Sequence, residues 1–127
     1  MAKVKQFTVA LENRPGRLAH VANVLADAKV NVLALLGSTA GGQGSVQVVV
    51  DSAGKTRKAF AAAGLSFTEG TLEEHELANK PGALAQLAGK LAKNGINIDC
   101  AYATVHKSAK KAIVVLGTSK AGETTGA

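Results

Sequence analysis

One segment of this 127-residue chain occurs twice, and the repeat constrains the fold more than any other feature. Residues 13–32 and 79–98 align without a gap at an offset of 79 − 13 = 66, and nine of the twenty positions carry the same residue. Agreement of this kind within a short chain indicates a duplicated structural unit. Length alone would suggest a single domain. The repeat changes this expectation to two related units.

Local patterns predict the elements of the first copy. Apolar and polar residues alternate over 4–11, as in a half-buried strand. Asn13 can cap the helix that follows, and apolar residues at helical spacing predict that helix over 18–28. The remaining elements expected are strands at 31–36, 45–51 and 65–71, a loose Gly-rich hairpin loop at 39–44, and a helix at 55–63. Their order is βαββαβ.

The second copy follows with almost no linker and is shorter. Its expected elements are a strand at 72–77, a helix at 82–93, strands at 96–105 and 111–116, and a hairpin loop at 106–110. We therefore predict an α+β fold of two tandem ferredoxin-like units with antiparallel sheets: a complete βαββαβ unit at 1–71 and a truncated βαββ unit at 72–118, which lacks the last helix and strand. The small, polar residues at 119–127 are expected to form a flexible tail.

Both copies carry the same turn, Asn-x-Pro-Gly-x-Leu, at 13–18 and 79–84. At equal spacing from the turn asparagine, each copy has a second asparagine at the start of the next strand, as Val30-Asn31-Val32 and Ile96-Asn97-Ile98. This pattern resembles the ACT domain, a small ligand-sensing module of amino-acid metabolism, and most closely the stand-alone tandem ACT proteins that have no attached enzyme. In that family the ligand lies between this turn and the start of strand 2 of a partner domain.

The chemistry of the turn suits an amino acid. Backbone N–H groups and the positive dipole at a helix N-terminus attract a carboxylate, and Gly16 and Gly82 let a ligand approach them. The amides of Asn13 and Asn79 can both donate and accept hydrogen bonds. The resemblance extends the expected ligand-binding set to Asn13, Pro15, Gly16, Arg17, Leu18, Asn31 and Val32 in the first copy and Asn79, Pro81, Gly82, Ala83, Leu84, Asn97 and Ile98 in the second.

Three observations limit this interpretation. Asn-x-Pro-Gly is also a good generic strand-to-helix turn, although asparagine is disfavoured in strands and both copies keep Asn31 or Asn97. Serine-sensing family members carry a histidine where this chain has Leu11 and Leu77, which argues against serine. The first turn has arginines at 14 and 17 where the second has Lys80 and Ala83, so the two sites need not bind equally.

The formal charge of +6 lies mostly in the first copy, because residues 1–66 carry +5 and residues 67–127 carry +1. A basic domain can bind nucleic acid, but only four residues are aromatic and no nucleic-acid motif is recognised. Solvated lysines on the surface explain the charge equally well.

Catalytic patterns are not found in the sequence. Its three histidines, His20, His75 and His106, are scattered without metal-ligand spacing, and the single cysteine, Cys100, makes a Cys-based zinc site or an internal disulfide impossible. We expect no enzymatic activity, no metal and no cofactor. The lone cysteine fits a reduced, cytoplasmic setting, and no apolar run is long enough to span a bilayer.

The functional hypothesis from the sequence is a non-catalytic sensor that binds a free amino acid or related small metabolite and regulates amino-acid metabolism allosterically. The uncovered strand edge of the short unit predicts a homodimer or larger homo-oligomer, and an enzyme of amino-acid metabolism is a candidate partner. The alternatives are a ligand-free interaction module that regulates an enzyme in trans and, third, a basic nucleic-acid-binding module.

Overall fold

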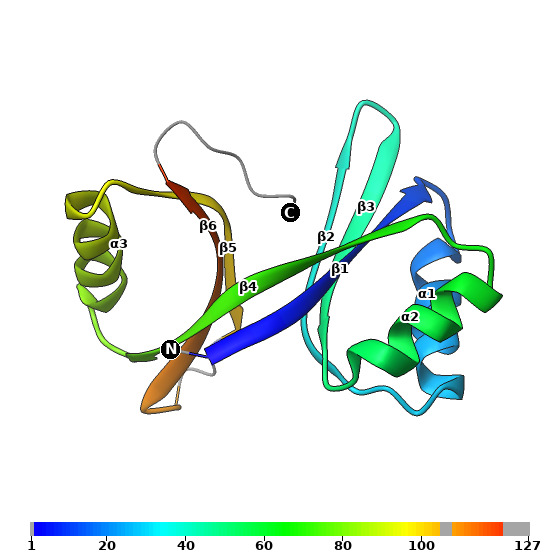
Figure 1. Cartoon of the computed structure of the whole chain (residues 1–127), viewed down its shortest axis with the longest axis horizontal. Helices are drawn as coiled ribbons and strands as arrows, with labels where there is room; N and C mark the ends of the chain where they lie inside the picture. Colours follow the sequence, from blue (N-terminus) through cyan, green and yellow to red (C-terminus); the bar gives the residue numbers. More distant parts are fainter. Residues whose placement is uncertain (1, 105–107, 121–127) are drawn as a thin grey trace. The chain divides into compact units, whose positions relative to one another are not determined.

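The computed structural model describes residues 2–104 and 108–120, and it has an α+β fold (Figure 1). The elements in these residues are β1 (Ala2–Glu12), α1 (Arg17–Asp27), β2 (Val32–Ala40), β3 (Gln43–Val50), α2 (Ala53–Ala62), β4 (Phe67–Ala78), α3 (Ala83–Lys93), β5 (Ile96–Thr104) and β6 (Lys111–Lys120). The antiparallel strands follow the order β2-β3-β1-β4-β6-β5. Two compact units divide the chain: the first unit is Lys5–Gly70, and the second unit combines Met1–Val4 with Thr71–Ala127.

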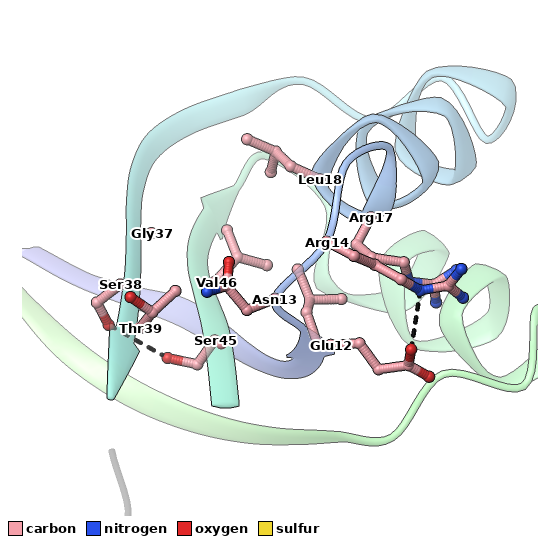
Figure 2. Close-up of a pocket in the computed structure, with 12 residues that line it drawn as sticks. Glu12, Asn13, Arg14, Arg17, Leu18, Gly37, Ser38, Thr39, Ser45 and Val46 are labelled. Carbon is pink, nitrogen blue, oxygen red and sulfur yellow. Dashed lines mark hydrogen bonds and ion pairs between the residues drawn. The ribbon is translucent and has the colours of Figure 1, made fainter. Parts of the chain in front are cut away.

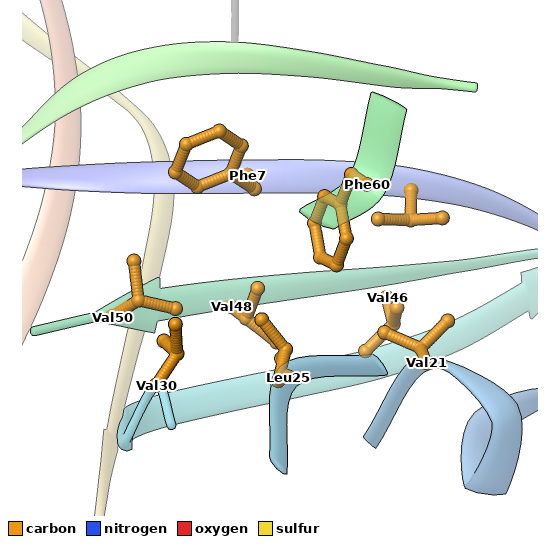
Figure 3. Close-up of a cluster of buried hydrophobic side chains, with 9 residues drawn as sticks. Phe7, Val21, Leu25, Val30, Val46, Val48, Val50 and Phe60 are labelled. Atoms are coloured by element: carbon orange, nitrogen blue, oxygen red, sulfur yellow. The ribbon is translucent and has the colours of Figure 1, made fainter. Parts of the chain in front are cut away.

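The first unit contains β1 from Lys5 onward, then α1, β2, β3, α2 and the start of β4, in the predicted βαββαβ order. Side chains from β1, β3 and both helices point toward one another and form its core (Figure 3). The rings of Phe7 and Phe60 meet edge to face at 5.8 Å, and Phe67 completes an aromatic group with centroid distances of 5.6 and 5.8 Å. The largest apolar residues of this unit are thus gathered under two helices.

The second unit contains the rest of β4, then α3, β5 and β6, and its core is smaller. Leu91 of α3 packs with Val114 and Leu116 of β6. The strand order places β1 beside β4, on the side opposite β6, and residues 2–4 of β1 group with this unit. In the first unit the fourth strand occupies the same position relative to strand 1. The start of β1 therefore takes the place of the fourth strand that the second copy lacks.

Two predicted boundaries are wrong. Residues 67–78 form one continuous strand, β4, rather than two strands that meet at 71 and 72, since Gly70 and Thr71 continue the extended backbone. Strand β6 extends to Lys120, so the predicted tail does not begin at 119. Ser119 is 8% exposed and pairs with Asn97 of β5. The predicted tail from 121 onward and residues 106–107 of the predicted hairpin loop lie outside the described residues.

The loose loop predicted at 39–44 is instead a tight hairpin turn. Strand β2 continues to Ala40 and β3 begins at Gln43, so that only Gly41 and Gly42 lie between them. Both glycines have a positive φ, which is the requirement of a type I′ turn at its two central residues. The hairpin is therefore long and well paired. Within the described part of the chain, no helix is both long and apolar enough to cross a membrane.

Candidate functional site

A pocket lies beside the turn between β1 and α1, entirely within the first unit (Figure 2). Its volume is about 200 Å³. The turn and the first residues of α1 form one wall, and the β2–β3 hairpin forms the other. The lining residues are Leu11, Glu12, Asn13, Arg14, Arg17, Leu18, Gly37, Ser38, Thr39, Gly44, Ser45 and Val46.

The helix at this turn begins in an unusual way. Its N-cap residue is Gly16, whose φ of 89° lies in the left-handed region that L side chains rarely adopt. No side chain caps α1, so the expectation that Asn13 does so is wrong. The chain turns too early for Asn13 to reach the helix end, because Arg14 N already donates to Glu12 O at 2.9 Å. Arg17 N donates to Arg14 O at 3.5 Å, and the next two N–H groups of α1, those of Leu18 and Ala19, have no partner within the helix and no side-chain acceptor among the described residues.

Charged groups gather on the turn side of this pocket. Arg14 Nε lies 2.8 Å from Glu12 Oε2, and the side chains of Arg14 and Arg17 point in the same direction in Figure 2. Arg17 Nε is buried and, among the described residues, has no hydrogen-bond partner. On the hairpin side, Ser38 Oγ and Ser45 Oγ lie 3.4 Å apart. The hairpin hydroxyl groups line one side of the pocket, whereas the guanidinium groups of Arg14 and Arg17 extend from the turn to the side away from the hairpin (Figure 2).

The second unit repeats this construction between β4 and α3. Gly82 is the N-cap of α3 with a φ of 90°, again without a side-chain cap. A pocket of about 190 Å³ adjoins it. Its lining residues are Leu77, Ala78, Asn79, Lys80, Ala83, Leu84, Ala103, Ala112 and Val114. Both expected turns thus carry a pocket, and each pocket contains its turn asparagine.

The two turn asparagines differ in their contacts. Asn79 Nδ2 donates to Ala109 O at 2.8 Å, and Asn79 N donates to Lys110 O at 2.9 Å. These bonds tie the second turn to the end of the β5–β6 connection. Within residues 2–104 and 108–120, the amide of Asn13 makes no such bond. Asn13 therefore keeps its donor and acceptor capacity.

The strand asparagines do not meet the turns within their own units. Asn31 N donates to Asp51 Oδ1 at 3.0 Å, and Asp51 N donates to Asn31 O at 3.1 Å. This pairing lies at the end of β3 where Val32 pairs with Val50, whereas the turn follows Glu12, which pairs with Gln43 at the other end. At roughly 3.3 Å per residue, the length of β3 separates the two ends by about 20 Å. Only a second domain could bring a strand asparagine to a turn.

Asn97 and Ile98 occupy the corresponding place in the second unit. Asn97 Nδ2 donates to Asp99 Oδ1 at 2.8 Å, and Ser119 Oγ donates to the same oxygen at 3.3 Å. The pairing of β5 with β6 is irregular between Ile98 and Cys100, at Asp99. These contacts fix the start of β5, and the participation of Asn97 and Ile98 in a ligand site stays a prediction.

The hairpin residues were not expected at the site. Gly37, Ser38, Thr39, Ser45 and Val46 line the first pocket because the tight turn carries β2 and β3 to the level of Asn13. The glycine-rich composition of 37–44 was the one available signal, and it predicted a flexible loop instead. Leu11 and Leu77, which precede the two turns, also line the pockets.

A separate polar cluster lies in the second unit. His75 Nε2 is 2.9 Å from Glu73 Oε1, and Thr118 Oγ1 donates to Glu73 Oε2 at 3.0 Å. The hydrogen bond with His75, helped by that with Thr118 and by the charge of Lys3, holds the pKa of Glu73 below its ordinary value although burial opposes this. Among the described residues, no group of three or more His, Cys, Asp or Glu side chains could hold a metal ion.

The first turn lies in a stretch that matches a known domain family. Residues 6–57, which include the whole turn and α1, match the model of the ACT domain. A comparison with curated proteins gives no match.

Solved structures extend the likeness to both units. Protein BT0572 from Bacteroides thetaiotaomicron superimposes with a TM-score of 0.86 at 29% identity, over 94% of this chain and 81% of that chain. The regulatory subunit of aspartate kinase from Thermus thermophilus gives 0.69 at 15% identity, over 91% and 83%. The corresponding subunit from Thermus flavus gives 0.66 at 16%, over 90% and 81%. The chain thus shares its fold with regulatory subunits.

Proposed function

We propose that this protein is a tandem ACT-domain regulator that binds a free amino acid or a related small metabolite at its Asn-x-Pro-Gly turns and performs no catalysis. One observation carries the proposal: both turns are built alike. Each has a glycine N-cap, at φ 89° or 90°, that leaves the helix end without a side-chain cap, and each adjoins a pocket. A generic turn needs neither an open helix end nor a pocket beside it.

The size and chemistry of the pockets support a small metabolite. Volumes of about 200 and 190 Å³ lie below the roughly 300–1,000 Å³ of pockets for drug-sized ligands. Uncapped N–H groups at a helix N-terminus favour a carboxylate. The side chains of Leu18 and Leu84 are 49% and 58% exposed and supply apolar surface at the same places. A ligand with a carboxylate and a small apolar part fits this combination.

We propose further that each site is completed by another domain in a homodimer or larger assembly. Strands β2 and β5 lie at the two ends of the strand order, and the strand asparagines Asn31 and Asn97 lie at their starts. Placing one of these starts against a turn of a second domain would bring Asn31 and Val32, or Asn97 and Ile98, to the ligand. A monomer by light scattering at micromolar concentration would contradict this assembly.

The regulated partner is proposed to be an enzyme of amino-acid metabolism. Two of the similar structures are named as regulatory subunits of aspartate kinase, and these names support an enzyme as the partner. Ligand binding would change the partner by favouring one of two arrangements of the units.

A thermal-shift screen of the twenty amino acids tests the proposal, because a ligand specific to the native state raises the melting temperature. We expect at least one amino acid to raise it. In ¹⁵N–¹H spectra the same ligand should move the amide signals of Leu18 or Leu84, while those of Ala61, in the last turn of α2, stay in place. No thermal shift with any of the twenty at millimolar concentration would overturn amino-acid binding.

A ligand-free interaction module is the second candidate, and one observation favours it. Leu33 and Leu35, on the edge strand β2, are 55% and 48% exposed. An apolar strand edge is a common place for another chain to pair. Under this alternative the screen is negative, and Leu35→Lys weakens binding of the partner enzyme.

A further inference from the structure

The second unit has an open groove where the first unit has its second helix. In the first unit, α1 and α2 pack side by side on the sheet (Figure 1). Among the described residues, no such helix accompanies α3 in the second unit. A cavity of about 390 Å³, here called the α3 groove, lies between β4 and α3, entirely within that unit. The residues that line it include His75, Glu76, Leu77, Lys80, Leu87 and Lys90.

The repeat identifies the α3 groove as the place of the missing helix. At the offset of 66, three of its lining residues match Val9, Val21 and Val24 of the first unit. These valines belong to or pack against the core that α2 joins through Phe60. The groove therefore corresponds to the surface that α2 covers in the first unit, and a helix is the occupant for which this fold already provides a precedent.

The α3 groove is more polar than the surface under α2. His75 stands where the first unit has Val9, and Lys90 where it has Val24. His75 Nε2 is already bonded to Glu73 Oε1 at 2.9 Å. A polar group with a hydrogen-bond partner does not need to be covered by apolar atoms. The groove can therefore stay open in the free protein, which suits an occupant that binds and leaves.

The α3 groove also carries unbalanced positive charge. Glu76 is the one acidic residue of its lining, and this carboxylate is paired with Lys111 at 2.8 Å. Within the described residues, Lys80 and Lys90 form no ion pair. Leu87, partly buried against the core of the unit, supplies apolar surface between them. An occupant that complements this lining has carboxylates beside an apolar stripe.

We propose that the α3 groove binds an acidic amphipathic helix of a partner protein, in the place that α2 occupies in the first unit. The apolar side of that helix contacts Leu77 and Leu87, and its carboxylates pair with Lys80 and Lys90. Insertion of an amphipathic helix into a groove is a common mode of recognition. This inference rests on the proposal that the protein regulates a partner, and it adds the surface and the chemistry of the contact.

Two peptides of matched shape test the proposal, because α2 is the helix that fills the corresponding place in the first unit. Both have the sequence of residues 51–65, which includes α2 and its N-cap serine. The acidic peptide carries Lys55→Glu, Arg57→Glu and Lys58→Glu, whereas the basic peptide keeps the three cations. The two peptides share their apolar side chains and differ in charge alone.

Binding is followed by ¹⁵N–¹H spectra of the full chain at about 0.15 M salt, where charges more than about 8 Å apart are largely screened. We expect the acidic peptide to move the amide signals of Leu87 and Lys90. It should bind about 5-fold more tightly than the basic peptide, the effect of two exposed ion pairs. The signals of Val21 and Val24 are the internal control and should stay in place, because α2 covers the corresponding surface of the first unit.

The variant Lys90→Glu tests the charge of the groove, and Lys58→Glu is its matched control. Each replaces an exposed lysine by glutamate, but Lys58 lies on α2 in the first unit. Lys90→Glu should lower the affinity for the acidic peptide by about 5-fold, since an attraction becomes a repulsion. Lys58→Glu should change that affinity by less than about 2-fold, because salt screens a distant charge.

Several outcomes would overturn the inference. They are the absence of shifts at Leu87 and Lys90 with millimolar acidic peptide, equal binding of the two peptides, and equal losses for Lys90→Glu and Lys58→Glu. Without peptide, movement of the Leu87 and Lys90 signals on deletion of residues 121–127 or on dilution would also overturn it, since the chain itself or a second copy would then cover the groove. None of these results affects amino-acid binding, which the thermal-shift screen tests separately.

Discussion

The two units share their turns but differ in the sheet face that their helices cover. In the first unit, Phe7 and Val9 are fully buried on β1, and Phe7 packs against Phe60 of α2. At an offset of 66 the second unit has Glu73 and His75 instead. Among the described residues the second unit has no counterpart of α2. Apolar side chains occur at these positions only where a second helix covers them.

Glu73 and His75 are partly buried and hydrogen-bonded on β4. The side chains of Glu73 and His75 are 20% and 17% exposed, and they contact each other at 2.9 Å. Thr118 occupies the second carboxylate oxygen of Glu73. A charged group that is partly removed from water is tolerated when it is hydrogen-bonded in this way. The comparison teaches that a repeated unit can lack a helix if the side chains that the helix would cover are polar and hydrogen-bonded to one another.

The largest effect should come from the position where the units differ most. Phe7→Ala removes a fully buried ring that contacts Phe60 and Phe67. This change should lower the free energy of unfolding by about 3–5 kcal/mol. Glu73→Ala, at the matching position, should cost about 1 kcal/mol. Urea denaturation measures both, and hydrogen exchange shows which unit opens. Equal losses for the two variants would contradict the comparison.

Replacing the N-cap glycine should lower stability by similar amounts in the two turns, although substitutions in the two cores have different effects. Gly16→Ala and Gly82→Ala each place a Cβ on a left-handed backbone. Each change should destabilise the protein by about 1 kcal/mol. Gly89→Ala is the control, since Gly89 lies inside α3 without a positive φ and has open space around it. That change should stabilise by about 0.5–1 kcal/mol. Thermal denaturation measures the stability of all three variants. If Gly89→Ala lowered the stability as the two turn variants do, the strain argument would be refuted.

The turn asparagines offer a smaller contrast. Asn79→Ala breaks the bond to Ala109 O. The loss of this hydrogen bond should cost about 1 kcal/mol. Asn13→Ala breaks no corresponding bond and should leave the melting temperature nearly unchanged while it weakens ligand binding. A loss of stability at Asn13 as large as that at Asn79 would show that the two turns are tied down equally.

The smallest effect is a pH dependence that involves the second unit. Because the pKa of Glu73 is lower in the folded protein than in the unfolded chain, its ionised form contributes stability above pH ~4.3, the ordinary pKa of glutamate. This contribution is lost as the pH falls through the lower folded pKa. Glu73→Gln should therefore flatten the acid side of the stability profile, and Thr118→Val should flatten it less. Unfolding midpoints measured from pH 2 to 7 test this prediction. If stability depends on pH in the Glu73→Gln variant as it does in the original protein, Glu73 does not contribute as described.

Much of this architecture could be predicted from the repeat. The offset of 66 locates both turns, the helix that follows each and the glycines at 16 and 82, because helix periodicity and Pro-Gly turns are local signals. The boundary between the copies could not be seen, because a strand that passes directly from one copy into the next contains no turn residues. The position of residues 2–4 beside β4 was equally invisible, since pairing between distant strands leaves no local pattern.

The site was predictable in part for the same reason. Asn13, Arg17 and Leu18, which the family resemblance implied, line the pocket beside the turn, and their role in ligand binding stays a prediction. The hairpin wall was missed because Gly41 and Gly42 were interpreted as flexible, whereas their left-handed backbone makes a tight turn. The environment of Arg17 could not be predicted, because the sequence does not show that its Nε is buried without a hydrogen-bond partner among the described residues.

The division of β1 between the two units has a consequence for the order of folding. The first unit is one uninterrupted stretch, 5–70, whereas the second joins residues 2–4 to residues beyond 70. Bringing those two stretches together in an unfolded chain would require closing the whole of 5–70 into a loop, at an entropic cost. Once the first unit has formed, Ala10 N already donates to Ser66 O, and the loop is closed. We therefore expect the first unit to form before residues 2–4 complete the sheet of the second, an order that matches the direction of synthesis on the ribosome.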